Sequence, residues 1–142
     1  MTTAGDVEIR LRNLSRDFIE GQRTHRVLDN ISADFLRGES VAIRGRSGSG
    51  KSTLLNLVGG IDAPDTGHVL IAGTDLAVLS ERDRTIFRRA HIGCVYLAFN
   101  LVPTLNVSDN VRLVLELSDV AAAEAGARLE DVLGAVGGAE GA

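Results

Sequence analysis

The sequence predicts an α/β fold organised around one phosphate-binding loop, and two observations support this prediction. Gly45, Gly50, Lys51 and Ser52 have the spacing of the two glycines, the lysine and the hydroxyl that mark such a loop. A short apolar run precedes the loop at residues 41–43, and apolar residues at helical spacing follow it. Strand, glycine-rich loop and helix therefore occur in the order that the motif requires.

Length and composition indicate an ordinary globular domain. The 142 residues suffice for one domain, and the hydrophobic fraction of 44% is typical of soluble proteins. A net charge of −4 gives no reason to expect a nucleic acid partner. No apolar run approaches the ~18 residues of a membrane span, and the first residues lack the apolar core of a signal peptide. The single cysteine, Cys94, suits a reducing cytoplasm, and we expect a buried core residue rather than a reactive thiol.

The segments before the loop predict two half-buried strands. Apolar and polar residues alternate over residues 7–11 and again over residues 31–35. Residues 18–26 between them are mostly polar and predict a loop. Alternating strands followed by the continuous apolar run at 41–43 favour an antiparallel sheet beside a parallel core.

Turn and cap signals divide the chain after the loop. Glycines 59 and 60 end the first helix, and a strand is predicted at residues 69–71. Ser80 and Asp83 resemble a capping box, which predicts a helix to about Arg89. The arginines of this helix favour a solvated face over a ligand site. The apolar residues 92–96 predict the next strand.

The C-terminal third predicts helices. Ser108 or Asp109 could cap a helix that begins near Val111, and apolar residues spaced i, i+3, i+4, i+7 predict a last helix over residues 129–136. An apolar run that ends at Asp119 resembles the magnesium-binding acidic motif of nucleotidases. Because Glu116 interrupts the run and no second acid follows, we favour a helix or strand segment over a metal ligand.

The loop residues suit a nucleotide triphosphate. Glycines at 45, 48 and 50 allow successive backbone N–H groups to converge on phosphate oxygens, and the helix N-terminus adds a positive dipole end. Lys51 can reach the β- and γ-phosphates, and the Ser52 hydroxyl can hold Mg²⁺. A glycine–serine turn beside a chance lysine is the alternative, which the flanking strand and helix patterns disfavour. The predicted nucleotide-binding residues of the loop are Gly45, Ser47, Gly48, Ser49, Gly50, Lys51, Ser52 and Thr53.

Further segments resemble one family. Arg-Gly-Glu-Ser-Val-Ala-Ile leads into the loop, and Leu-Leu-Asn-Leu-Val-Gly-Gly-Ile-Asp and Pro-Asp-Thr-Gly-His-Val follow it. Residues 99–111 read Phe-Asn-Leu-Val-Pro-Thr-Leu-Asn-Val-Ser-Asp-Asn-Val and are the most specific. From about residue 7 to residue 136 the chain resembles the ATP-binding subunit of an ABC transporter, close to the lipoprotein-releasing and macrolide-exporting branch.

The resemblance implies a three-layer P-loop NTPase fold of the ABC type, present in part. Residues 1–39 would form an antiparallel β part with an adenine-stacking loop, residues 40–96 the phosphate-loop core, and residues 97–142 the start of a helical subdomain. The C-terminal core strands would be missing, so we expect low stability of the chain alone. Phe18 would stack on adenine, and a core phenylalanine is the alternative.

The implied cofactors are ATP and Mg²⁺. The implied partners are membrane permease subunits and a second ATP-binding subunit, at the cytoplasmic face of the cell membrane. Leu97 stands where the family has a glutamine that approaches the metal and the attacking water. The signature motif, the catalytic glutamate motif and the switch histidine do not occur in the 142 residues. We therefore expect ATP binding without hydrolysis.

Two alternative functions are compatible with parts of this pattern. A degenerate nucleotide-binding module, regulatory or without a role, would show the same phosphate loop and the same departures. A small kinase or GTPase would need a base-specificity motif or a lid of arginines, and the sequence after Phe99 argues against it.

Overall fold

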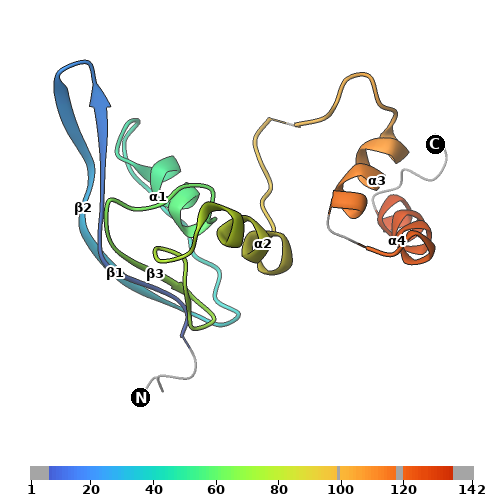
Figure 1. The fold of residues 1–142 in the computed structure, drawn as a ribbon, viewed down its shortest axis with the longest axis horizontal. Coiled ribbons are helices and arrows are strands. Elements are labelled where there is room, and N and C mark those ends of the chain that lie inside the picture. The colour runs from blue at the N-terminus through green and yellow to red at the C-terminus, as the bar shows by residue number, and fades with distance from the viewer. Residues whose placement is uncertain (1–6, 99, 118–119, 136–142) are drawn as a thin grey trace. The chain divides into compact units, whose positions relative to one another are not determined.

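The structure is a computed structural model that describes residues 7–98, 100–117 and 120–135. The chain divides into two compact units, Met1–Gly93 and Cys94–Ala142 (Figure 1). The divisions after residues 39 and 96 that the resemblance implies remain predictions. Phe99, Asp119 and Val136, which belong to segments interpreted in the sequence analysis, lie outside the described residues.

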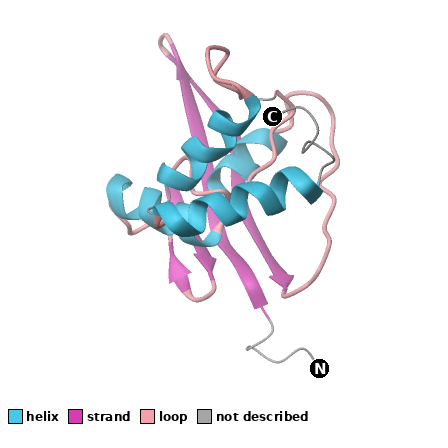
Figure 2. Ribbon diagram, turned by 90° about the vertical axis from the view of Figure 1, so that its right-hand side faces the viewer, coloured by secondary structure: helices cyan, strands magenta, loops and turns pink. Residues whose placement is uncertain are grey.

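The first unit is built on a four-stranded antiparallel sheet with the order β2-β1-β3-β4. The strands are β1 (Val7–Glu20), β2 (Arg23–Leu36), β3 (Thr66–Ile71) and β4 (Thr74–Asp75). All three predicted strands of this sheet are present, and each is longer than the sequence pattern indicated. Figure 2 shows how far the two long strands, β1 and β2, extend.

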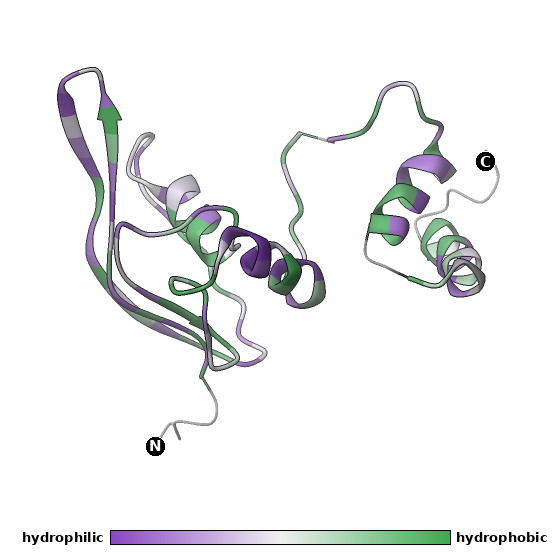
Figure 3. Cartoon of the chain, in the orientation of Figure 1, coloured by the Kyte–Doolittle hydropathy of each residue, from purple (hydrophilic) through white to green (hydrophobic). Residues whose placement is uncertain are grey.

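The prediction of a loop over residues 18–26 is wrong. β1 and β2 continue to Glu20 and Arg23, joined by a two-residue turn in which Gly21 has φ 63°. β3 pairs with β1 only as far as Ser15, opposite Thr66, so the outer part of the hairpin is a two-stranded ribbon. Residues 18–26 at the outer end of this ribbon are exposed and mostly polar (Figure 3), whereas Leu28 of β2 is buried in the core.

The described residues of the first unit also form two helices, α1 (Lys51–Val58) and α2 (Glu81–His91). The helix predicted after the loop is confirmed. The cap predicted at Ser80 is present as well, since its hydroxyl accepts a hydrogen bond of 3.1 Å from the backbone N–H of Asp83, while the carboxylate of Asp83 accepts from that hydroxyl at 2.6 Å. The core joins β1, β2, β3 and the segment after β4 to Leu57 of α1. Its buried residues are Leu11, Leu14, Leu28, Leu57, Val69, Ile71 and Leu76.

The strands predicted at residues 41–43 and 92–96 are not formed. A strand needs a neighbour for its backbone N–H and C=O groups, and within the described residues the four strands of the sheet pair only with one another. Val41 and Ile43 are exposed and line, with Leu55, a groove of about 270 Å³. Cys94 is exposed as well, so the prediction of a buried thiol is wrong for the same reason.

The second unit contains α3 (Val107–Leu117) and α4 (Ala122–Ala135). α3 begins earlier than predicted, because Asn106 caps it: its Oδ1 accepts a 2.8 Å hydrogen bond from the N–H of Asp109. The ambiguous run after Leu113 is helical through Leu117. Ala125, Leu129 and Leu133 form the buried face of α4. None of the helices in the described ranges is long and apolar enough to cross a membrane.

Candidate functional site

The phosphate loop enters α1 through two glycines in the left-handed region. Gly48 has φ 76°, and Gly50, at the N-cap position of α1, has φ 87°. The N–H of Ser49 donates to the carbonyl oxygen of Arg46 at 3.2 Å, and the N–H of Leu54 donates to Gly50 at 2.8 Å to start the helix. Left-handed residues within a turn make consecutive N–H groups face one concavity, which is an anion-binding arrangement.

Gly50 also lies where no side chain fits. A Cβ at this position would lie 2.9 Å from Cδ2 of Leu28 and 3.0 Å from the carbonyl oxygen of Val27. The loop therefore packs directly against β2 at the point where the chain turns into α1. This close approach fixes the N-terminus of α1 relative to the β1–β2 hairpin.

Lys51 spans the loop from its first helical position. Its Nζ donates to the carbonyl oxygens of Gly45 at 2.9 Å and Arg46 at 2.6 Å, and lies 3.5 Å from Oγ of Ser49. No carboxylate among the described residues forms an ion pair with it. Neutral carbonyl oxygens orient the ammonium group and leave its full charge for an anion.

The loop and the first residues of α1 line an open pocket of about 580 Å³, within the range of small-molecule sites. His25 and Val27 of β2 form its other wall. The sequence does not predict either as a site residue, since His25 falls in the predicted loop and Val27 lies between that loop and the predicted strand at 31–35. Gly45 stands outside the lining and contributes through its carbonyl contact with Lys51. The loop residues that line the pocket are Ser47, Gly48, Ser49, Gly50, Lys51, Ser52 and Thr53.

Phe18 lies on β1, directly opposite His25 in the antiparallel ladder. It is outside the lining of the pocket, whereas its cross-strand neighbour His25 belongs to it. The ring is 41% exposed, so Phe18 is not a core residue, and the guanidinium carbon of Arg16 lies 5.4 Å from its centroid. Its role in adenine stacking remains a prediction.

A magnesium site would depend on Ser52 together with the nucleotide. The described part of the chain contains no group of three or more His, Cys, Asp or Glu side chains that could hold a metal ion. Ser52 is the second residue of α1 and lines the pocket, which is where a hydroxyl ligand beside bound phosphates is needed.

Similarity to known proteins decides the family. The family model described as ABC transporter matches residues 28–141. The chain belongs to the ABC transporter family. It is 50% identical over 132 residues to an uncharacterised ABC transporter ATP-binding protein of Mycobacterium tuberculosis H37Rv, and this match covers 93% of the chain and 53% of the relative. The chain thus spans about half the length of this relative.

Two named transport proteins are similar to this ABC family member. The lipoprotein-releasing system ATP-binding protein LolD of Chromohalobacter salexigens is 40% identical over 132 residues, covering 93% of the chain and 56% of LolD. The macrolide export ATP-binding/permease protein MacB 2 of Yersinia pestis is 38% identical over 136 residues, covering 96% of the chain and 20% of MacB 2.

The fold is that of an ABC cassette. The ATP-binding cassette MJ0796, solved as a dimer in a post-hydrolysis state with ADP and phosphate, matches with a TM-score of 0.80 and 34% identity. The match covers 88% of the chain and 55% of MJ0796. The predicted fold class, an ABC-type P-loop NTPase with an N-terminal antiparallel sheet, is confirmed.

Proposed function

We propose that the chain binds ATP and Mg²⁺ through the loop at residues 45–53, as the nucleotide-binding part of an ABC transporter. The observation that carries this proposal is the position of Lys51. Its ammonium group is held over the loop by two carbonyl oxygens and has no carboxylate partner among the described residues. A cation presented in this way beside left-handed glycines suits a polyphosphate.

Each residue of the site has a distinct task in this proposal. The backbone N–H groups of the loop and the N-terminus of α1 bind the phosphate oxygens. Lys51 exchanges its carbonyl contacts for charge-assisted hydrogen bonds to the β- and γ-phosphates. The Ser52 hydroxyl coordinates Mg²⁺, which neutralises phosphate charge when it is bound. Phe18 offers its exposed ring to adenine, by analogy with aromatic–base stacking.

Binding without turnover is the expected behaviour of the 142 residues. Hydrolysis needs a group that orients or deprotonates the attacking water, and no Asp or Glu stands among the described residues that line the pocket. Leu97 replaces the glutamine expected from the family and has no hydrogen-bonding group on its side chain. This substitution also favours the second candidate function, a nucleotide-binding module that does not hydrolyse ATP.

In the cell, we place this activity in a transporter. The chain would dock on membrane permease subunits at the cytoplasmic face of the membrane and pair with a second ATP-binding subunit. Its similarity to LolD and MacB supports lipoprotein release or export as the coupled process. A chain with this loop would contribute one nucleotide site to the assembly.

Calorimetric titration of the 142-residue chain with ATP and Mg²⁺, alongside a phosphate-release assay, tests the proposal. We expect binding, a loss of about tenfold or more in affinity for Lys51→Ala, and no phosphate release, because a hydrogen bond to a charged group contributes ~1.5–3 kcal/mol. Arg46→Ala is the control, since it removes a side chain but keeps the carbonyl oxygen that holds Lys51. Equal affinity of the Lys51→Ala variant would refute the site. Steady magnesium-dependent turnover would instead refute only the absence of hydrolysis.

A further inference from the structure

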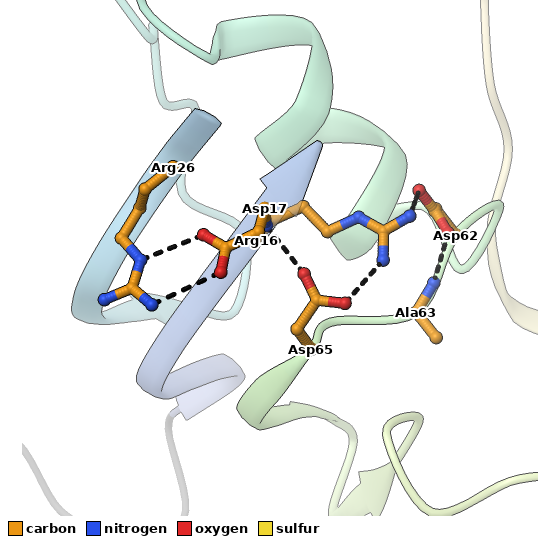
Figure 4. Close-up of polar contacts among 6 residues, drawn as sticks. All are labelled: Arg16, Asp17, Arg26, Asp62, Ala63 and Asp65. Atoms are coloured by element: carbon orange, nitrogen blue, oxygen red, sulfur yellow. Dashed lines mark hydrogen bonds and ion pairs between the residues drawn. The ribbon is translucent and has the colours of Figure 1, made fainter. Parts of the chain in front are cut away.

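Arg16 joins two separate carboxylates with one guanidinium group. Its Nη2 lies 2.8 Å from Oδ2 of Asp62, and its Nη1 lies 3.0 Å from Oδ1 of Asp65 (Figure 4). The side chain is 21% exposed, and its third nitrogen, Nε, is buried without a partner among the described residues. Two carboxylates on the two ends of a planar fork fix the plane as well as the position of the group.

Both carboxylates are themselves held in place. The N–H of Asp62 donates to the carbonyl oxygen of Asn56, in the last turn of α1, at 3.3 Å. The N–H of Asp65 donates to Ser15 at 3.1 Å, and its Oδ2 accepts a hydrogen bond of 2.6 Å from the N–H of Asp17. Arg16 therefore connects β1 to the C-terminal end of the helix that begins at the phosphate loop.

A second ion pair lies beside this arrangement. The carboxylate of Asp17 accepts hydrogen bonds from Nε and Nη2 of Arg26, at 2.9 Å and 3.3 Å (Figure 4). This pairing lowers the pKa of Asp17, chiefly through the hydrogen bond from Arg26. Asp17 is thus paired with Arg26, and Arg16 with Asp62 and Asp65.

The same guanidinium lies against the aromatic ring of Phe18. Its central carbon is 5.4 Å from the ring centroid, within the range of a cation–π interaction. Residues 16 and 18 are two apart on β1, so their side chains share a face of the strand. His25, opposite Phe18, lines the phosphate-loop pocket, so this part of the hairpin adjoins the loop.

We infer that Arg16 is a positioning residue for Phe18, anchored by Asp62 and Asp65 so that the ring keeps a fixed offset from the phosphate loop. This inference rests on the proposed ATP binding and adds a residue that determines affinity for the base. One face of the ring contacts the guanidinium, and the exposed remainder is left for a purine. Arg16 would therefore act on the nucleoside end of ATP and not on its phosphates.

A comparison of two ligands tests this role. ATP carries a base and inorganic triphosphate does not, so a positioning residue for Phe18 affects only the first. We expect Arg16→Gln to weaken ATP binding about fivefold, the size of a cation–π contact at a half-exposed site, and to change triphosphate binding less than twofold. Phe18→Leu should give a similar selective loss. Adding Arg16→Gln to Phe18→Leu should cost little more, because the two residues act as one unit.

Two further variants complete the experiment. Arg12→Gln is the matched control: Arg12 lies on β1 like Arg16, and its loss breaks an exposed ion pair with Asp34 of β2, so it should affect neither ligand. Arg16→Lys keeps the charge without the fork and should give an intermediate loss for ATP; it replaces Arg16→Gln should that variant fail to fold.

The outcomes are distinguishable. Equal losses for ATP and triphosphate in Arg16→Gln would make Arg16 a structural tie only and overturn the inference, as would unchanged ATP affinity. An unmodified chain that binds neither ligand would overturn the proposed function itself, and the inference with it. A chain that prefers ATP over triphosphate and loses that preference in Arg16→Gln supports both.

Discussion

The ammonium nitrogen of Lys51 lies 2.6 Å from the carbonyl oxygen of Arg46. With the second contact to Gly45, this places a helix residue across the mouth of the loop that precedes it. Lys51 thus shapes the backbone of the loop proposed to bind phosphate, in addition to supplying a charge. Substitution of Lys51 should therefore change the loop itself in addition to weakening its affinity for ligand.

Hydrogen exchange can measure this effect on the loop. In Lys51→Ala, two hydrogen bonds that restrain the start of the loop are lost, so the amide protons of residues 46–50 should exchange faster than in the unmodified chain. Mass spectrometry of peptides that cover these residues provides the measurement. Arg46→Ala serves as the control and should leave exchange unchanged. Identical exchange in Lys51→Ala would show that the carbonyl contacts do not hold the loop.

Gly50 and Gly48 allow backbone strain to be separated from steric overlap. Both have positive φ, but a Cβ at Gly50 would meet Leu28 and Val27 within 3.0 Å, whereas at Gly48 it would meet nothing within 4 Å. Gly48→Ala should lower the free energy of unfolding by ~1 kcal/mol, the cost of a left-handed alanine. Gly50→Ala should lower it by roughly 2–4 kcal/mol, because overpacking adds to the strain. Denaturant unfolding gives both values, and equal losses would contradict the close packing of the loop on β2.

The cap of α2 allows a test that does not depend on the proposed nucleotide site. Ser80→Ala removes the acceptor of the Asp83 N–H and should lower the free energy of unfolding by ~1 kcal/mol. Ser80→Asn, which restores a capping oxygen, should recover most of that loss. Denaturant unfolding of both variants provides the measurement. An unchanged midpoint in Ser80→Ala would show that the cap contributes nothing to stability.

Stability should fall in acid through two aspartates. The hydrogen bond from Arg26 lowers the pKa of Asp17, and that from Arg12 lowers the pKa of Asp34. A carboxylate whose pKa is lower in the folded state stabilises the fold above its unfolded pKa of ~3.9, and this contribution disappears as the pH falls through the folded pKa. The free energy of unfolding should therefore decrease below about pH 4. In Asp17→Asn the decrease should be shallower; an identical slope would rule out a contribution from Asp17.

The sequence predicted those parts of the fold that local chemistry specifies. Ser80 and Asp83 predict the start of α2, because a helix cap is a contact between residues only three apart in the sequence. The glycine-rich loop predicts the start of α1, because the left-handed backbone conformations in this loop favour glycine. Seven of the pocket's lining residues followed from the same motif, and its wall of His25 and Val27 did not. The sequence feature that indicates this hairpin is Gly21, because its position between Glu20 and Arg23 suits a two-residue turn.

Contacts between distant residues were beyond sequence reasoning. Arg16 meets Asp62 and Asp65 across 46 and 49 positions, and nothing in the local pattern pairs them. The apolar run at residues 41–43 predicts a strand, but a strand also needs a neighbouring strand for its backbone hydrogen bonds. Among the described residues no neighbour pairs with this run, so hydrophobicity alone gave a wrong assignment.

The end of the three-stranded region at Ser15 has a consequence for how the hairpin can vary. Beyond this residue β1 pairs only with β2, and Leu11 and Leu14 of the core lie on the other side of the boundary. The tip at Gly21 and Gln22 contributes nothing to the hydrophobic interior, so extra residues inserted there should leave the sheet intact. The length and composition of the tip can therefore diverge among relatives while the sheet stays the same.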